Sequence, residues 1–206
     1  MQYINRRKIH QLVWTIAILL YGFASLMEFL MNPEIIDITF IPFSIFYVSS
    51  SLLVGLLGSG QLFLIIKKKI SYIFLGFISA LSIALVVALI LTPFPQTISF
   101  SDDLGENIRL VSTNYPYSVR IYAIILSSVG GTALLLGSLY SFIRDRHRYY
   151  SLFFSLGALM PMFRNIPFGY LGNELGGVIF LFIGFLLSNV YIKKQTSKFN
   201  NQISQK

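Results

Sequence analysis

Glu28 and Arg164 are charged residues inside long apolar stretches, and they are the best candidates for chemistry in this sequence. Glu28 lies 17 residues after Gln11, about 26 Å along a helix, and Arg164 lies 14 residues after Tyr150, about 21 Å along another. Both stretches follow basic segments, so both side chains approach the same membrane face. Because a charge inside hydrocarbon is costly and is usually paired or faces water, we expect the two to meet or to share a hydrated pocket near the outer leaflet.

Five further polar residues complete the predicted pocket. Three share the helix face of Glu28, at spacings of three, four and seven residues, and the other two lie beside Arg164 and at the start of the last apolar run. The predicted ligand-binding residues are Glu28, Arg164, Asn165, Asn32, Glu174, Tyr21 and Ser25. Pro161 and Pro167 flank Arg164 and predict a kink or an early helix end near Pro161, because each proline removes a backbone hydrogen bond. The alternatives are an ion pair that only joins two helices, and two side chains that reach the interface separately.

The sequence carries no pattern typical of a catalytic or metal centre. Cysteine is absent, and the two histidines, His10 and His147, stand far apart at the ends of apolar runs. HExxH, Walker, GxSxG and GxGxxG motifs are all missing from the sequence. We therefore predict no catalytic residues, no metal ligands and no cofactor, and the pattern disfavours an enzyme.

Six apolar runs, each near the 20 or so residues that span a bilayer as a helix, fill most of the 206 residues. Charged residues make up only 12% of the chain, against about 25% in soluble domains. The predicted fold is all-α, a polytopic integral membrane protein with six transmembrane helices in one bundle. The predicted spans, in one domain of residues 1–194, are about 11–31, 40–66, 70–92, 120–143, 149–170 and 174–192. The first run is longer than the roughly 7–15 residues of a cleavable signal core, so we expect it to be retained.

The short segments between the runs alternate in charge. Thirteen of the sixteen basic residues lie before the first run, after the second, after the fourth and after the sixth, where Lys193 and Lys194 precede the polar tail of residues 195–206. The other segments are acidic. By the positive-inside rule, both termini are cytoplasmic and the long loop at 93–119 is outside. We expect a multi-pass protein of the plasma membrane whose basic segments meet anionic headgroups. The net charge of +8 is thus explained without nucleic acid.

Two local patterns predict structure within this plan. Residues 97–100 and 108–112 flank a turn-rich centre and predict a small hairpin over the bundle. Small residues recur every four positions in several spans and predict faces where helix backbones approach closely. Two such stripes are Gly76, Ala80, Ala84 and Ala88 in the third span and Ser51, Gly55 and Ser59 in the second.

These observations favour a sensor or accessory membrane subunit that binds a ligand or lipid in the polar pocket. The alternative is a small-solute transporter or channel that uses the same pocket, and an enzyme acting on lipids is the third. Charged residues are scarce at mid-depth, where alternating-access sites usually lie, and this ranks binding above transport. A membrane protein partner and a second copy of the chain both remain open as partners.

Overall fold

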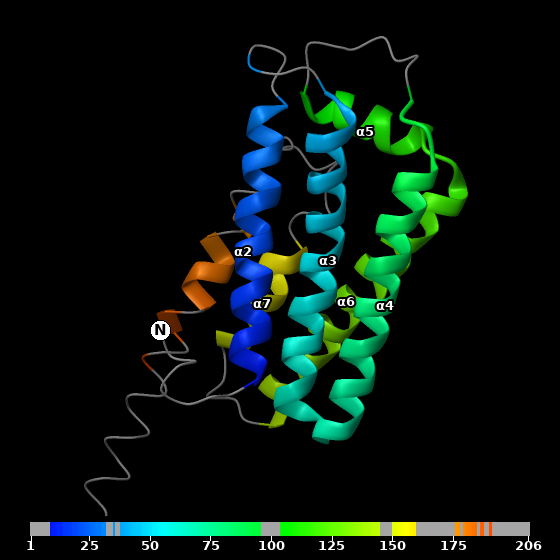
Figure 1. The fold of residues 1–206 in the computed structure, drawn as a ribbon. Helices are drawn as coiled ribbons and strands as arrows, with labels where there is room; N and C mark the ends of the chain where they lie inside the picture. The colour runs from blue at the N-terminus through cyan, green and yellow to red at the C-terminus, as the bar shows by residue number, and fades with distance from the viewer. Residues whose placement is uncertain are drawn as a thin grey trace, which may run out of the picture. The chain divides into compact units, whose positions relative to one another are not determined.

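The computed structural model describes residues 9–31, 35, 38–95, 104–144, 150–159 and most of 176–190. In these ranges the regular structure is helical, which confirms the all-α prediction. Clustering of contacts divides the chain into two units, Met1–Ala133 and Leu134–Lys206, with the boundary inside one helix. The helices are α2 (Ile9–Leu30), α3 (Phe40–Ile65), α4 (Lys68–Leu91), α5 (Leu104–Asn114), α6 (Tyr117–Arg144) and α7 (Tyr150–Leu159) (Figure 1).

Four of the described helices, α2, α3, α4 and α6, are long and apolar enough to cross a membrane. Their bounds agree with the first four predicted spans to within three residues. The agreement has a physical cause, since an apolar run in lipid must satisfy its backbone hydrogen bonds internally and therefore becomes a helix. These four helices indicate a membrane-embedded protein. The fifth and sixth spans are described only in part, by α7 and by helical positions between 176 and 190, so the count of six stays a prediction.

In the first unit, neighbouring helices alternate in direction. Trp14 of α2 lies against Gly60 of α3, and Phe63 of α3 contacts Tyr72 of α4 with ring centroids 5.1 Å apart. These contacts place the start of α2 beside the α3–α4 turn, where Lys67, Lys68 and Lys69 are exposed; we call this the lysine end. At the opposite end, which we call the α5 end, α5 lies across the helices (Figure 1).

The middle of this unit is closed by contact between α3 and α6. A Cβ added to Gly130 would lie 2.5 Å from the Cα of Gly55, and one added to Gly58 would overlap the carbonyl of Gly130. Ile78 and Leu126 are fully buried beside Gly55. Glycine is required here because the two backbones touch, and such close approach is what stabilises helix pairs in lipid. The predicted close-packing face of the second span is thus a buried face, with Ser51, Gly55 and Ser59 on it.

The corresponding prediction for the third span is wrong for two of its residues. Gly76 and Ala80 of α4 are exposed, and nothing in the structure lies within 4 Å of a Cβ added to Gly76. The helix instead buries a face that includes Ile78, Leu85 and Leu89. Lipid solvates small and large apolar residues alike, so a stripe of small residues does not by itself select the packed face.

The outer loop contains a helix where a hairpin was predicted. Residues 108–112 belong to α5, and residues 97–100 lie outside the described part of the chain. Ile108, Val111 and Tyr115 are buried at 0–2% exposure. Their spacings of three and four residues follow the helical period, so the segment forms an amphipathic helix with its apolar side on the bundle. The hairpin prediction failed because this period was read as strand-like alternation.

The second unit is held together by serines and glycines. The hydroxyls of Ser138 in α6 and Ser155 in α7 hydrogen-bond each other, and Ser151 donates to the carbonyl of Ser138 at 3.1 Å. A Cβ on Gly157 of α7 would lie 2.8 Å from the carbonyl oxygen of Gly177, so α7 packs closely on the helical segment 176–190. The kink predicted near residue 161 falls outside the described residues.

Candidate ligand site at the α5 end

Three residues of the predicted pocket can be placed in the structure, all on α2. Glu28 and Tyr21 are half-buried, whereas Ser25 is exposed. The side of α2 that is most buried includes Ala17 and Ala24, so the inward face is rotated away from Ser25. Ser25 therefore does not lie on the packed side of α2 within the first unit, and its part in the pocket stays a prediction. Asn32, Arg164, Asn165 and Glu174 lie outside the described residues, so the meeting of Glu28 and Arg164 stays a prediction.

An aromatic cluster closes the α5 end of the first unit. Phe43 of α3 stacks on Tyr47 at 5.5 Å and on Tyr115 at 5.7 Å between ring centroids. Phe94, which follows α4, meets Phe40, Phe43 and Tyr115 edge-on at 6.1–6.3 Å. These five rings, which we call the aromatic cluster, tie the start of α3 to the end of α4 and to the α5–α6 turn. Stacked and edge-on pairs at these distances stabilise packing beyond the area that they bury.

Tyr115 is the polar member of the cluster that stands out. Its side chain is 2% exposed, and its hydroxyl oxygen is buried with no hydrogen-bond partner among the described residues. Burial, and secondly the nearby Tyr47 phenol, raise the pKa of Tyr115 to about 12. The phenol is therefore neutral at physiological pH. A buried hydroxyl without a partner is destabilising, so this position is held by the stacking of its ring.

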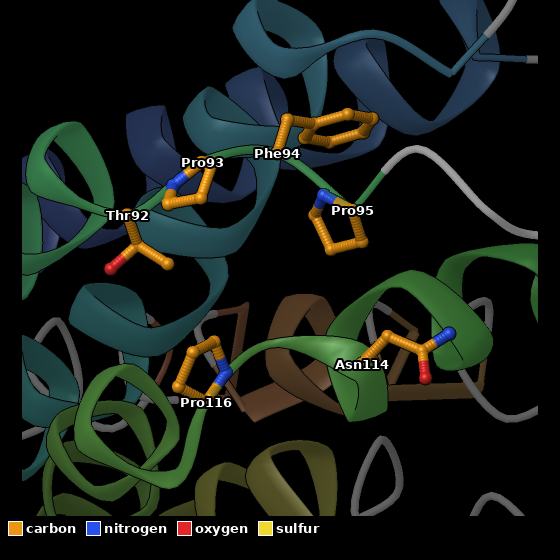
Figure 2. A pocket seen from close by; sticks show the side chains of 6 residues that line it. All are labelled: Thr92, Pro93, Phe94, Pro95, Asn114 and Pro116. Carbon is orange, nitrogen blue, oxygen red and sulfur yellow. The ribbon is translucent and has the colours of Figure 1, made fainter.

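Beside the cluster lies a cavity of about 370 Å³, which we call the outer cavity. Figure 2 shows its two sides, the segment that leaves α4 and the segment that joins α5 to α6. The lining residues are Thr92, Pro93, Phe94, Pro95, Asn114 and Pro116. Three of the six are prolines, which contribute a carbonyl oxygen and no N–H. The lining is thus rich in hydrogen-bond acceptors and has an aromatic ring.

The hydrogen bonds around the outer cavity use up several of the nearby donors. The Thr92 hydroxyl donates to the Ala88 carbonyl at 2.8 Å, and the Thr92 amide donates to the Leu89 carbonyl. The Arg120 guanidinium donates to the Thr113 carbonyl at 3.3 Å. These bonds occupy donors that would otherwise be available to an anionic ligand in the outer cavity.

None of the residues predicted from the sequence to bind a ligand lines this cavity. A signal was present in the segments TPFP at 92–95 and NYP at 114–116, where prolines follow directly on helix ends. Prolines so placed stop a helix and leave its last carbonyls without the usual amide partners.

A second polar region lies at the lysine end, where polar contacts join α2 to α3. The Trp14 indole N–H donates to the Leu57 carbonyl at 3.4 Å, and His10 meets the Trp14 ring edge-on at 6.0 Å. Ser71 is fully buried near the start of α4. Among the described residues, no group of three or more histidines and carboxylates comes together that could hold a metal ion.

No family model, curated protein or solved structure matches this chain. The functional argument therefore depends on the residues and their geometry.

Proposed function

We propose that this chain is a sensor or accessory membrane subunit that binds a ligand or lipid near the outer leaflet and carries nothing across. The close packing of α3 against α6 in the first unit is the observation that supports this most directly. Gly130 of α6 touches the backbone of α3 at mid-height, and the aromatic cluster and α5 cover the end above it. A transporter needs a site that is reached from both sides, and the backbone contact between α3 and α6 leaves no space between these two helices at mid-height.

The ligand-binding residues in this proposal include the polar pocket predicted around Glu28 and Arg164. Glu28 is half-buried two residues before α2 ends, at the depth expected for the outer leaflet. A carboxylate at this depth favours a cationic partner, and Arg164 is the predicted one. Asn165, Asn32 and Glu174 complete the pocket in the proposal.

The topology that we propose has six spans with both termini in the cytoplasm, in the plasma membrane. The alternating directions of α2, α3 and α4 support it, because they bring the start of α2 and the lysines at 67–69 to the same end. At that end, exposed lysines would bind anionic headgroups, at roughly 1 kcal/mol each.

Topology can be tested cleanly because the chain has no cysteine of its own. Lys68→Cys and Asn114→Cys change exposed residues at opposite ends of the first unit. A membrane-impermeant maleimide should label Asn114→Cys in intact cells, and label Lys68→Cys and Ser204→Cys only after permeabilisation. Labelling of Ser204→Cys in intact cells would place the carboxyl terminus outside and contradict the proposed topology.

Binding and transport are separated by reconstitution of the full chain in liposomes. We expect proton and small-ion flux at the level of protein-free vesicles, together with retention of specific lipids by the purified protein in native mass spectrometry. Flux that is lost in Arg164→Leu and kept in Arg109→Leu would establish the transporter instead. Release of headgroups from the vesicle lipids would establish an enzyme.

A further inference from the structure

We infer that the outer cavity binds an organic ammonium group, carried either by a phospholipid headgroup or by a free amine. This inference rests on the proposed binding function and names the ligand class. The cavity is lined on one side by the residues that follow α4 and on the other by the last residue of α5 and by Pro116 (Figure 2). The carboxyl ends of two helices therefore border one space.

We expect the end of α4 to supply carbonyl oxygens that can accept hydrogen bonds from a ligand. The last carbonyls of a helix have no partner within it. In α4, the Ala88 and Leu89 carbonyls are satisfied by Thr92, but Pro93 and Pro95 have no N–H with which to satisfy the carbonyls of the final residues. A helix carboxyl end also carries partial negative charge, which favours a cation.

Two positive features near the cavity have hydrogen-bond partners in the structure. The amino end of α6 borders the cavity through Pro116, whose carbonyl accepts the amides of Val119 and Arg120 at 3.0 and 3.2 Å. The Arg120 guanidinium is bonded to the carbonyl of Thr113 and so offsets the carboxyl end of α5. The attraction for a cation that we infer comes from the carboxyl end of α4.

The shape and chemistry of the lining select an organic cation over a bare metal ion. None of the six described lining residues is a carboxylate, and one of them, Phe94, is aromatic. Aromatic faces attract alkylated ammonium groups, whereas hard metal ions prefer carboxylate oxygens. A volume of about 370 Å³ has room for an ethanolamine or choline group with its solvent.

The depth of the cavity suits a lipid headgroup. The 24 residues of α4 make a helix of about 36 Å, longer than the roughly 30 Å of hydrocarbon, so its end reaches headgroup level. A phospholipid amine and a soluble amine share the chemistry that the lining recognises, and the experiment below separates them.

The test uses the purified full chain, native mass spectrometry and an equimolar mixture of phosphatidylethanolamine and phosphatidylglycerol. The wild type should retain phosphatidylethanolamine preferentially. Asn114→Lys places a competing ammonium in the lining and should lower that retention about tenfold, whereas Asn114→Asp should raise it several-fold. Thr113→Lys is the matched control, because it adds the same charge at an exposed neighbour outside the lining and should stay within about twofold of the wild type.

Added ethanolamine distinguishes the two sources of the amine. Displacement of the lipid by millimolar ethanolamine assigns the site to soluble amines, and persistence of the lipid assigns it to a headgroup. Equal retention of the two lipids, or equal effects of Asn114→Lys and Thr113→Lys, would overturn the inference. Specific retention of phosphatidylglycerol alone would overturn it and leave the proposed binding function standing, whereas flux in liposomes would remove the function itself.

Discussion

Replacing Gly130 with alanine adds one methyl group where α6 meets α3. The new Cβ would lie 2.5 Å from the Cα of Gly55 and 2.6 Å from both its amide nitrogen and the Val54 carbonyl oxygen. The shortest of these distances is 0.9 Å below the 3.4 Å at which ordinary contact begins. The atoms that it meets are backbone, so no rotamer change relieves the overlap and the two helices must separate by about 1 Å. Overpacking of this kind costs about 1–3 kcal/mol, and we expect about 3 kcal/mol because close backbone contact stabilises this pair.

The free energy of unfolding can be measured by titration of mixed micelles with dodecyl sulfate, followed by the fluorescence of Trp14, the one tryptophan of the chain. Gly76→Ala is the matched control, because it makes the same change at an exposed helix position where nothing lies within 4 Å. Removing an exposed helix glycine should leave stability unchanged or raise it by up to about 1 kcal/mol. If Gly130→Ala stays within about 0.5 kcal/mol of the wild type, the α3–α6 contact does not hold the first unit together.

Three further changes test other contacts. Gly60→Ala should displace the Trp14 indole, which overlaps the position of the added methyl, and so shift the tryptophan emission; an unchanged spectrum would contradict the contact. Ser138→Ala should lower the free energy of unfolding by about 1 kcal/mol by leaving the Ser155 hydroxyl without its partner, and chemical denaturation would detect no change if that bond is absent. Tyr115→Phe should raise the free energy of unfolding at pH 7 by about 1 kcal/mol, because the lost hydroxyl is buried and has no partner among the described residues; a decrease would show that it has one. Burial and the nearby Tyr47 raise the pKa of Tyr115 to about 12. Between pH 10 and about 12 the folded chain therefore keeps the phenol proton that the unfolded chain loses, and the free energy of unfolding falls over this range by at most about 3 kcal/mol. Denaturation at pH 7, 10 and 12 should show this loss in the wild type and a smaller one in Tyr115→Phe.

The spans were predictable and the packed faces were not, for the same physical reason. A run of about 20 apolar residues must be helical in lipid whatever its order, so 40–66 was found within one residue of the observed Phe40–Ile65. Lipid also removes the contrast between core and solvent that marks the buried face of a soluble helix. Ser25 and Gly76 were placed on inward faces by their type and spacing, and both are exposed.

The site predicted from the sequence consists of charged and polar side chains, whereas the chemistry inferred for the outer cavity depends largely on the backbone. Glu28 stood out in the sequence because a carboxylate in an apolar run is costly, and its half-buried position near the end of α2 suits a binding role. The inferred chemistry of the outer cavity instead depends on backbone carbonyl oxygens, because three of its six described lining residues are prolines, which have no N–H. A proline after a helix usually indicates only that the helix ends. In the structure, Pro116 and Asn114 lie across the cavity from Pro93 and Pro95. This arrangement, which the sequence does not reveal, is what makes these prolines candidates for a ligand site.

The two ends of the first unit differ in a way that bears on direction. At the lysine end, the exposed lysines surround the amino end of α4, and both features attract anions. At the α5 end, the carboxyl end of the same helix opens onto the outer cavity and favours cations. One helix thus presents opposite charge preferences to the two membrane faces. A zwitterionic phospholipid could bind at the α5 end through its ammonium group and at the lysine end through its phosphate. If these lysines set the orientation of the protein, as the positive-inside rule predicts, replacing residues 67–69 with glutamate should invert or scramble the labelling of Asn114→Cys.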